Sequence, residues 1–393
     1  MLERLAFGEL PAKHHLALHA ASGVLRYESC LTRQGFDGAY TIAYHEHRPQ
    51  ALEAIGDPVF LPLDGSGPQS GGAGPPPRLE LSRRHYRTDY LPTDRAEGGA
   101  TPLLYNADLV VGCRQPTHDD ATYHLNAEAD ELWFVLSGRG TLRSALGDLD
   151  FKDGDYVCVP KGVLYRLIID ASEPQRYLSL ELYGGVGIPA AFRNPVGQLR
   201  MDAPYSHRDF RRTRFEGPQD EGLREVWVKA GPVRQRFVYG HNPLDVVGWD
   251  GSVYPWAFPI RNFQPRVSSV HLPPTWHGTF DAGGALICSF VPRPLDFHPD
   301  AVPCPYPHIS VDMDELIFYV EGEFSSRLGV SRGSLTHHPR GVPHGPHPGR
   351  YEESLGARRT EEVAVMLDCK ARLLPTRSAL AIEDRSYEAS FRG

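Results

Sequence analysis

Residues 307–324 read PHISVDMDELIFYVEGEF, and residues 123–140 read YHLNAEADELWFVLSGRG. In both stretches a histidine precedes a glutamate by seven positions, and the apolar run after the glutamate ends at a glycine a further seven positions on. Runs rich in aromatic and β-branched residues and bounded by glycine are typical of buried strands. The same pattern twice in one chain predicts two related β units.

A second element follows each of these stretches. Residues 154–166 read GDYVCVPKGVLYR and residues 333–345 read GSLTHHPRGVPHG, so that glycine, proline, glycine and a final Tyr165 or His344 share one spacing. Together the elements resemble the paired motifs of the cupins, which are small antiparallel β-barrels of the jelly-roll kind. The resemblance implies an all-β bicupin with two jelly-roll barrels and short peripheral helices.

A stretch of low complexity interrupts the chain early. Residues 61–78, LPLDGSGPQSGGAGPPPR, favour a linker or a long surface loop because Gly, Ser and Pro do not build a packed core. We expect an N-terminal segment over residues 1–100, an N-terminal barrel over 101–200 and a C-terminal catalytic barrel over 201–393. Short helices are expected near residues 49–55 and at the C-terminal end.

The composition narrows the classes of function. Of the 393 residues, 41% are hydrophobic, which is enough for a sizeable core, and a net charge of −8 without a Lys/Arg-rich run disfavours nucleic acid as a partner. Six scattered cysteines without a CxxC pair do not indicate a disulfide framework. No secretory h-region is present, and no stretch approaches the roughly 18 apolar residues of a membrane span, so we expect a cytoplasmic protein without a membrane partner.

The second copy of the pattern carries a candidate metal site. His308, Glu315 and His344 supply two imidazoles and one carboxylate, the facial triad of non-haem Fe(II) oxygenases, and inward side chains of neighbouring barrel strands converge. Asp314 competes as the carboxylate, but Glu315 keeps the motif spacing, and adjacent strand residues face opposite ways. We therefore predict Fe(II) at His308, Glu315 and His344, with another metal or no metal as alternatives.

The first copy has lost part of the motif. Its final position is Tyr165 in place of histidine, although His124 and Glu131 are kept. These three side chains could hold a metal, but tyrosine is an uncommon ligand. A remnant whose polar groups bond to one another is the expected state.

Further stretches resemble homogentisate 1,2-dioxygenase. They are GGVGIPAAFRNPVGQL (184–199), NPLDVVGWDGSVYPWAFPIRNFQP (242–265), the block from PHIS through PHGPHPG (307–349) and SLGARRTEEVAVMLDC (354–369). The resemblance implies a dioxygenase that uses Fe(II) and O₂ to open the ring of a homogentisate-like dihydroxylated aromatic acid, in tyrosine and phenylalanine catabolism. It also implies a trimer-based homo-oligomer.

The same resemblance implies roles for histidines around the iron. His271 in SSVHLPPTW matches the position of an acid–base histidine, and His338 matches a histidine beside the bound hydroquinone. Both are therefore predicted to be catalytic, His338 as the donor of a hydrogen bond to superoxide or to a ring hydroxyl. His347 lies near His344 in sequence and is a further candidate for contact with the substrate. His337 should point the opposite way from His338 along a strand. The remaining HxH, at residues 45–47, is interpreted as a loop feature.

The sequence departs from the family at two positions that help to hold the substrate. Ile309 and Phe324 stand where the family has arginine and tyrosine, so a different dihydroxylated aromatic acid is an alternative substrate. Arg327 and Arg340 are the candidates for binding its carboxylate. The rival functions are a cupin dioxygenase for a gentisate-like or other hydroquinone, a non-catalytic metal-binding bicupin, and a cupin isomerase that uses Zn or Mn.

Overall fold

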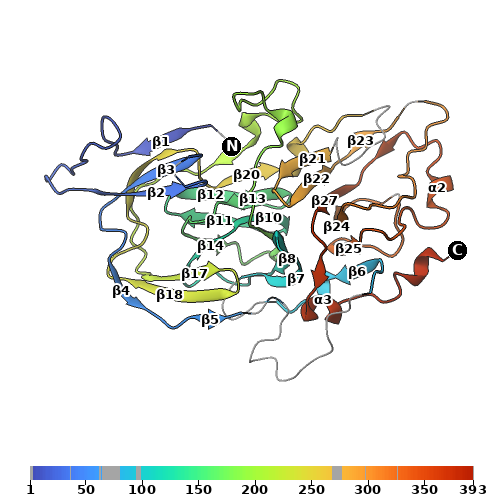
Figure 1. The fold of residues 1–393 in the computed structure, drawn as a ribbon, viewed down its shortest axis with the longest axis horizontal. Coiled ribbons are helices and arrows are strands. Elements are labelled where there is room, and N and C mark those ends of the chain that lie inside the picture. Colours follow the sequence, from blue (N-terminus) through green and yellow to red (C-terminus); the bar gives the residue numbers. More distant parts are fainter. Residues whose placement is uncertain are drawn as a thin grey trace. The chain divides into compact units, whose positions relative to one another are not determined.

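Strands dominate the computed structural model, which describes residues 3–35, 37–61, 63, 80–93, 99–267, 277–296, 298–324 and 326–392 (Figure 1). The α-helices in these ranges are short, namely α2 (Arg350–Glu353) and α3 (Arg377–Ala381). The predicted all-β cupin class with short peripheral helices is thereby confirmed. Nearly all of the predicted linker at 61–78 lies outside the described residues.

The chain forms two compact units, each assembled from three segments. Unit 1 comprises Met1–Pro62, Gln115–Tyr177 and His207–Phe258. Unit 2 comprises Leu63–Arg114, Leu178–Ser206 and Pro259–Gly393. These boundaries differ from the contiguous ranges 1–100, 101–200 and 201–393 that we expected from the sequence. The physical reason is strand pairing over long separations, described below for each unit.

Unit 1 contains the first copy of the repeated pattern. Its largest sheet has the order β12-β11-β14-β9-β17-β18-β4, with β5 also pairing with β18, and β9 and β17 run parallel. A smaller sheet has the order β1-β19-β3-β2, and a third set follows the order β16-β20-β13-β10. The strands are β1 (Leu5–Gly8), β2 (Tyr27–Thr32), β3 (Tyr40–His45), β4 (Leu52–Ile55), β5 (Val59–Phe60), β9 (Tyr123–Asn126), β10 (Asp130–Ser137), β11 (Arg139–Ser144), β12 (Gly147–Lys152), β13 (Asp155–Val159), β14 (Tyr165–Ile169), β16 (Arg211–Arg212), β17 (Glu225–Ala230), β18 (Val233–Tyr239), β19 (Val246–Gly251) and β20 (Trp256–Pro259).

Residues 1–62 of the expected N-terminal segment belong to unit 1, because their strands pair with strands near residue 240. Strands β1 and β3 flank β19, and β4 lies beside β18. The prediction of a helix near residues 49–55 is wrong, since Leu52 and Ile55 in β4 pair with Tyr239 and Phe237. Hydrogen bonding to a distant strand outweighs the weak local helix preference of this segment.

The core of unit 1 combines aliphatic side chains with large aromatic ones. Trp133, Trp249 and Tyr254 are at most 1% exposed. Along β14 the side chains of Tyr165, Leu167 and Ile169 alternate inward with half-buried neighbours, as the period of two in a strand requires. Burial of each large side chain contributes about 1.5–3 kcal/mol.

Unit 2 contains the second copy of the pattern. Its main sheet has the order β21-β22-β27-β24-β25-β6, so β6, from well before residue 100, joins strands near residue 335. Strands β8, β7 and β28 are consecutive neighbours, and β23 pairs with β26. The strands are β6 (Arg84–Arg87), β7 (Thr101–Tyr105), β8 (Leu109–Arg114), β21 (Gly278–Asp281), β22 (Ala285–Phe290), β23 (Arg293–Pro294), β24 (Asp314–Glu321), β25 (Ser334–His338), β26 (Arg359–Thr360), β27 (Val363–Cys369) and β28 (Leu374–Pro375).

The remaining elements are short or cross a boundary. Strand β15 (Arg176–Leu182) contains the boundary after Tyr177. The 3₁₀ helices are η2 (Thr88–Tyr90), η3 (Ala190–Phe192), η4 (His207–Asp209), η5 (Ile260–Asn262) and η6 (Ala389–Phe391).

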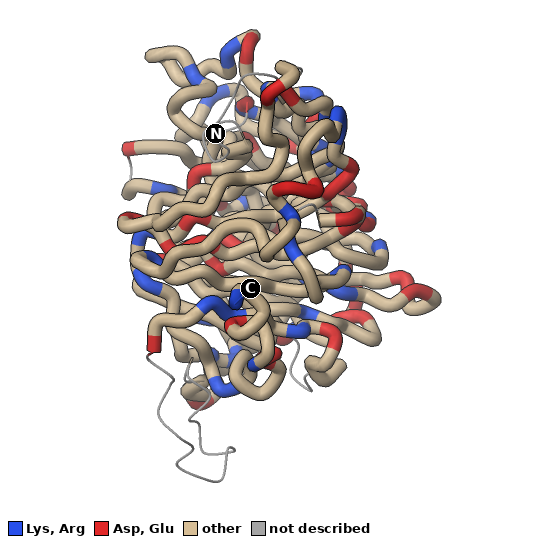
Figure 2. The backbone as a smooth tube through the Cα atoms, turned by 90° about the vertical axis from the view of Figure 1, so that its right-hand side faces the viewer, with Lys and Arg blue, Asp and Glu red and all other residues tan. Residues whose placement is uncertain are grey.

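Lys and Arg are interspersed with Asp and Glu along the described chain (Figure 2). The six cysteines all lie in the described residues, and none of them is in a disulfide. A search of the described helices finds none with the length and apolar character that crossing a bilayer requires.

Candidate metal centre

Strand β24 presents two sets of side chains to opposite faces. Asp314 and Leu316 are fully buried on one face. Glu315, on the other face, stands opposite His338 of β25 and Asp368 of β27. Because directly opposed residues of antiparallel strands share a face, Glu315, His338 and Asp368 point to the same side of the sheet.

His308 and His344 are paired by backbone hydrogen bonds. Each donates its amide N–H to the carbonyl of the other, at 2.8 and 2.9 Å, in an isolated antiparallel bridge. Gly345 permits this approach, since a Cβ there would lie 2.6 Å from Pro307 Cα. The two imidazole rings consequently lie with their centroids 4.3 Å apart. The glycine that follows the motif histidine is therefore needed for the two rings to converge.

The ligand atoms of His308, Glu315 and His344 all lie within 4.8 Å of one another. Nδ1–H of His308 donates to the Tyr306 carbonyl at 3.0 Å, and Nδ1–H of His344 donates to the Val342 carbonyl at 2.9 Å. These bonds select the tautomer that leaves the Nε2 lone pair of each ring free for a metal.

A buried atom supports the fit of a metal ion. His344 Nε2 is buried and has no hydrogen-bond partner among the described residues, and Glu315 Oε2 is 3.9 Å from it. Leaving such a nitrogen unsatisfied costs about 1–3 kcal/mol, which a coordinated cation would recover. Two neutral imidazoles and a carboxylate with room between them fit the donor set of a ferrous ion.

The protonation states suit metal binding. Burial raises the pKa of Glu315, but the hydrogen bond from His338 and the positive charge of Arg327 outweigh it and hold that pKa well below its usual range. Burial lowers the pKa of His344. The carboxylate is therefore ionised and the imidazole neutral near pH 7, as coordination requires.

His338 links the carboxylate of Glu315 to the C-terminal segment. Its Nδ1–H donates to Glu315 Oε1 at 2.7 Å, and its Nε2 accepts from the Tyr387 hydroxyl at 3.1 Å. Burial lowers the pKa of His338 to about 3 and raises the pKa of Tyr387. A neutral imidazole thus connects a protonated phenol to an ionised carboxylate, with both ring nitrogens engaged.

The opposite face of β24 holds a separate polar network. Nε2–H of His337 donates to Asp314 at 3.0 Å, and the Arg340 Nε–H also donates to Asp314 at 3.0 Å. The prediction that His337 and His338 point opposite ways is confirmed. Glu315, and not Asp314, lies with the two histidines.

The two candidate arginines differ in what they contact. Arg340 is engaged by Asp314 and by the carbonyls of Cys369 and Lys370, so its guanidinium serves the network on the far face of β24. Arg327 is buried, its Nη2 lies 3.9 Å from Glu315 Oε1, and its Nε has no partner among the described residues. Of the two, Arg327 lies at the cluster.

His347 and Phe324 have mainly packing contacts. His347 accepts from the Leu328 N–H at 3.3 Å, donates to Ser390 Oγ at 2.8 Å and stacks on Phe391. Burial lowers the pKa of His347 to about 4. Phe324 packs edge-on against Tyr319 with ring centroids 4.5 Å apart. His347 therefore ties a loop to η6.

Two residues at the site belong to no motif in the sequence. Tyr387 lies far along the chain from the motifs, and Asp368 belongs to an ordinary apolar strand pattern. Burial raises the pKa of Asp368 to about 7, and the charge of Glu315 adds to the effect. The predicted catalytic residue His271 lies outside the described residues.

The corresponding residues of unit 1 bond to one another. The Tyr165 hydroxyl donates to Glu131 at 2.6 Å, and Arg234 Nη2 lies 3.3 Å from His124 Nδ1. His124 Nε2 is 3.6 Å from an oxygen of Asp120. Among the described residues, neither His124 nor Glu131 belongs to a group of three His, Cys, Asp or Glu side chains whose ligand atoms converge.

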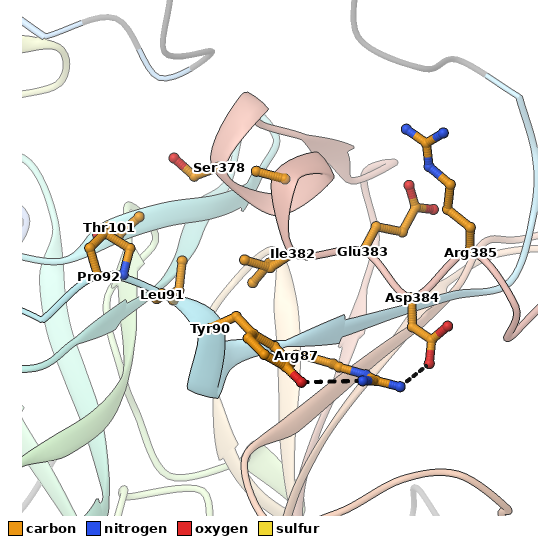
Figure 3. Close-up of a pocket in the computed structure, with 11 residues that line it drawn as sticks. Arg87, Tyr90, Leu91, Pro92, Thr101, Ser378, Ile382, Glu383, Asp384 and Arg385 are labelled. Carbon is orange, nitrogen blue, oxygen red and sulfur yellow. Dashed lines mark hydrogen bonds and ion pairs between the residues drawn. The ribbon is translucent and has the colours of Figure 1, made fainter.

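A cavity of about 650 Å³ in unit 2 is lined by residues of β6, η2, β7 and α3 and of the stretch after α3, and none of the histidine cluster lines it (Figure 3). Its charged walls are largely paired with one another. Arg87 donates to Asp384 at 2.8 Å and lies 3.5 Å from the Tyr90 hydroxyl, and Glu383 accepts from Arg84 at 2.6 Å. Three of the four charged side chains that line the cavity are thereby paired, and Arg385 is the fourth.

The sequence of this chain is similar to a known family of proteins. The family model for the N-terminal part of homogentisate 1,2-dioxygenase matches residues 89–260. A protein of Saccharolobus solfataricus, described as a candidate dioxygenase, is 31% identical over 98% of this chain and 97% of its own length. The chain belongs to the homogentisate 1,2-dioxygenase family. The family predicted from the sequence is confirmed, and membership places the protein among the dioxygenases.

More distant relatives are named for the family itself. Homogentisate 1,2-dioxygenase of Bradyrhizobium diazoefficiens is 24% identical over 58% of this chain and 52% of its own. The enzyme of Nitrobacter hamburgensis is 26% identical over 55% of this chain and 49% of its own. Among solved structures, a cupin 2 conserved barrel domain protein from Leptotrichia buccalis covers 75% of this chain and 99% of its own, with 10% identity and a TM-score of 0.35.

Proposed function

We propose that this family member is an Fe(II)-dependent, ring-cleaving dioxygenase for a homogentisate-like dihydroxylated aromatic acid in tyrosine and phenylalanine breakdown. The observation that carries the proposal is the convergence of His308, Glu315 and His344 around a buried Nε2 without a partner. Three protein ligands on one side leave coordination positions open for a substrate and O₂. Ferrous iron held there supplies electron transfer between an electron-rich ring and O₂, which amino-acid side chains do not provide.

The surrounding residues orient the ligands. His338 holds one oxygen of Glu315, which leaves the other oxygen, 3.9 Å from His344 Nε2, directed at the metal position. Tyr387 fixes the tautomer of His338 by donating to its second nitrogen. Since outer contacts of this kind orient a ligand and raise its affinity for a metal, His338 acts here as a positioning residue.

Arg327 is our candidate for binding the substrate carboxylate. It lies beside Glu315 and keeps an Nε–H without a partner, whereas Arg340 is held by Asp314 on the other face of β24. A guanidinium can bind a carboxylate through two parallel N–H···O bonds. His271 is proposed, on family resemblance alone, as the base that accepts the proton of a ring hydroxyl.

Oxygen uptake by Fe(II)-loaded protein tests the proposal. The panel comprises homogentisate, gentisate, methylhydroquinone and catechol, and ring opening is followed by ultraviolet absorbance. We expect one O₂ consumed per homogentisate opened, and the highest kcat/KM with that substrate. Turnover of gentisate in preference to homogentisate would keep the iron chemistry and overturn the proposed substrate. No oxygen uptake with any dihydroxylated ring would contradict the proposed enzyme.

A further inference from the structure

A second group of metal-type ligands lies in unit 1, away from the cupin motifs in sequence. His47, His241 and Asp245 each offer one ligand atom, and these atoms lie within 4.8 Å of one another. We propose that these three side chains bind a divalent transition-metal ion of the zinc type. This site is independent of the iron proposal, because it uses different residues in a different unit.

The backbone holds the three residues on a rigid frame. His45, the last residue of β3, pairs with Val246, the first residue of β19, so that His47 and Asp245 lie just beyond the same end of a strand pair. The amide N–H of Glu46 donates to the Asp245 carbonyl at 3.1 Å, and that of His47 donates to Asp245 Oδ2 at 2.9 Å. The carboxylate is thereby fixed relative to His47.

The loop that carries His241 is also constrained. The buried side chain of Asn242 binds the carbonyls of Gln219 and Leu244 and accepts from the Leu244 N–H at 3.2 Å. The ring of His241 packs edge-on against Tyr239, with centroids 5.5 Å apart. Preorganised ligands of this kind lose little conformational entropy when a metal binds.

The carboxylate has an orienting partner of its own. Asp245 Oδ1 accepts from His45 Nδ1–H at 2.8 Å, and the other nitrogen of His45 contacts Ser29 Oγ at 2.8 Å. A chain from Ser29 through His45 therefore occupies one oxygen of Asp245 and directs the second towards His47 and His241. Outer contacts of this kind accompany protein metal sites.

The distances leave space for an ion. Asp245 Oδ2 is 3.2 Å from His47 Nδ1 and 3.8 Å from His241 Nε2, and the second distance is too long for a hydrogen bond. Bonds to zinc of about 2.0–2.1 Å place neighbouring ligand atoms roughly 3–4 Å apart. The two rings stack with centroids 4.2 Å apart at 16° and so present nitrogens to the same oxygen.

The site is closed on one side and open on the other. The side chains of Asp245 and His241 are 5% and 12% exposed, whereas that of His47 is 49% exposed. An ion could enter past His47 and complete its coordination with water. Imidazole suits zinc, copper and nickel, and a single carboxylate balances part of the charge, which favours this class over Ca²⁺ or Mg²⁺.

Zinc titration by isothermal calorimetry at pH 7 tests the proposal. The background is His344→Ala, in which the cluster of unit 2 has lost a ligand. We expect one equivalent of Zn²⁺ to bind to this variant. Adding His241→Gln should weaken binding at least about 100-fold, and His45→Ala should weaken it roughly 10- to 100-fold while leaving the three ligands in place. A matched exposed change, His118→Gln, should leave the affinity unchanged.

A second measurement covers the case in which His344→Ala does not fold. Wild-type protein saturated with Fe(II) under anaerobic conditions is dialysed against Zn²⁺, and both metals are counted by mass spectrometry. We expect one zinc per chain beside the iron, and loss of that zinc alone in His47→Gln. Equal zinc content in His47→Gln and wild type would overturn the proposal, as would unchanged affinity in the His241→Gln titration.

Discussion

His338 Nδ1 lies 2.7 Å from Glu315 Oε1, across the antiparallel pair of β25 and β24. The next residue back, His337, lies 3.0 Å from Asp314 on the opposite face of the same strands. Two adjacent histidines thus form hydrogen bonds with two different carboxylates on opposite faces of β24. Glu315 faces the candidate metal position, whereas Asp314 belongs to a buried structural network.

The two histidines should therefore respond differently to substitution. His338→Ala removes the contact that orients Glu315, so Fe(II) affinity should fall roughly 10- to 100-fold. His337→Ala should lower stability and leave Fe(II) affinity within about twofold. Competition with a chromophoric chelator under anaerobic conditions measures the affinity. Equal Fe(II) affinities in the two variants would remove the positioning role of His338.

Protonation of Asp314 should lower the folding stability of the protein at acidic pH. Asp314 is fully buried and accepts from His337, from Arg340 and from the Leu373 N–H at 2.9 Å. Burial raises its pKa, but these bonds outweigh burial and hold the pKa well below its usual range. Because the folded pKa is depressed, the stabilisation is present above the unfolded pKa of about 3.9 and is lost as pH falls.

Asp314→Ala should consequently cost about 3–5 kcal/mol in urea unfolding at pH 7, since it strands two buried donors. The difference from wild type should be constant from pH 7 to pH 5 and shrink below about pH 4. The control is Glu321→Ala, at the other end of β24, whose exposed pair with Arg261 is worth less than about 1 kcal/mol. If the difference in unfolding free energy between wild type and Asp314→Ala grew as the pH fell, the pKa of Asp314 would not be depressed in the folded protein.

Arg327→Gln tests the carboxylate contact. Loss of a charged hydrogen-bond pair worth about 1.5–3 kcal/mol should raise the KM for homogentisate roughly 10- to 100-fold. The KM for methylhydroquinone, which has no carboxylate, should change less than threefold. Arg340→Gln serves as the matched control and should alter stability without this selectivity. A parallel rise for both substrates would assign Arg327 to the support of Glu315 alone.

His271→Ala tests the proposed base. Loss of general base catalysis typically lowers kcat by about 10²- to 10⁴-fold, and the variant should keep full iron content because His271 is not among the proposed ligands. Lost activity should recover in part at higher pH, where more of the ring hydroxyl is ionised in solution. Unchanged turnover in iron-replete protein would exclude the role.

The repeated motif predicted the cluster in unit 2 because its spacing encodes strand register. Glu315 precedes the apolar run of β24, and strand alternation separates it from Asp314, so neighbouring positions could be assigned to faces from the sequence. Tyr387 and Asp368 could not be found this way, because their contacts with His338 and Glu315 arise from pairing over long separations. The predicted helix near 49–55 is wrong for the same reason, since β4 pairs with β18. The pairing of β6 with β25 likewise joins a strand before residue 100 to the unit that contains the second motif.

His45 and His47 are a second case in which local sequence does not reveal a long-range contact. An isolated HxH is a weak motif, and from the sequence alone it is interpreted as a loop feature. Their partners His241 and Asp245 lie about 200 residues away and meet them through the pairing of β3 with β19. A local pattern cannot indicate a site whose second half is so distant in the chain.

The iron content of wild type and His344→Ala, both reconstituted anaerobically with Fe(II) and desalted, tests the central claim most directly. We expect one tightly held iron per wild-type chain and less than a tenth of that in a His344→Ala variant with an unchanged circular dichroism spectrum. Equal iron retention by the two proteins would contradict it.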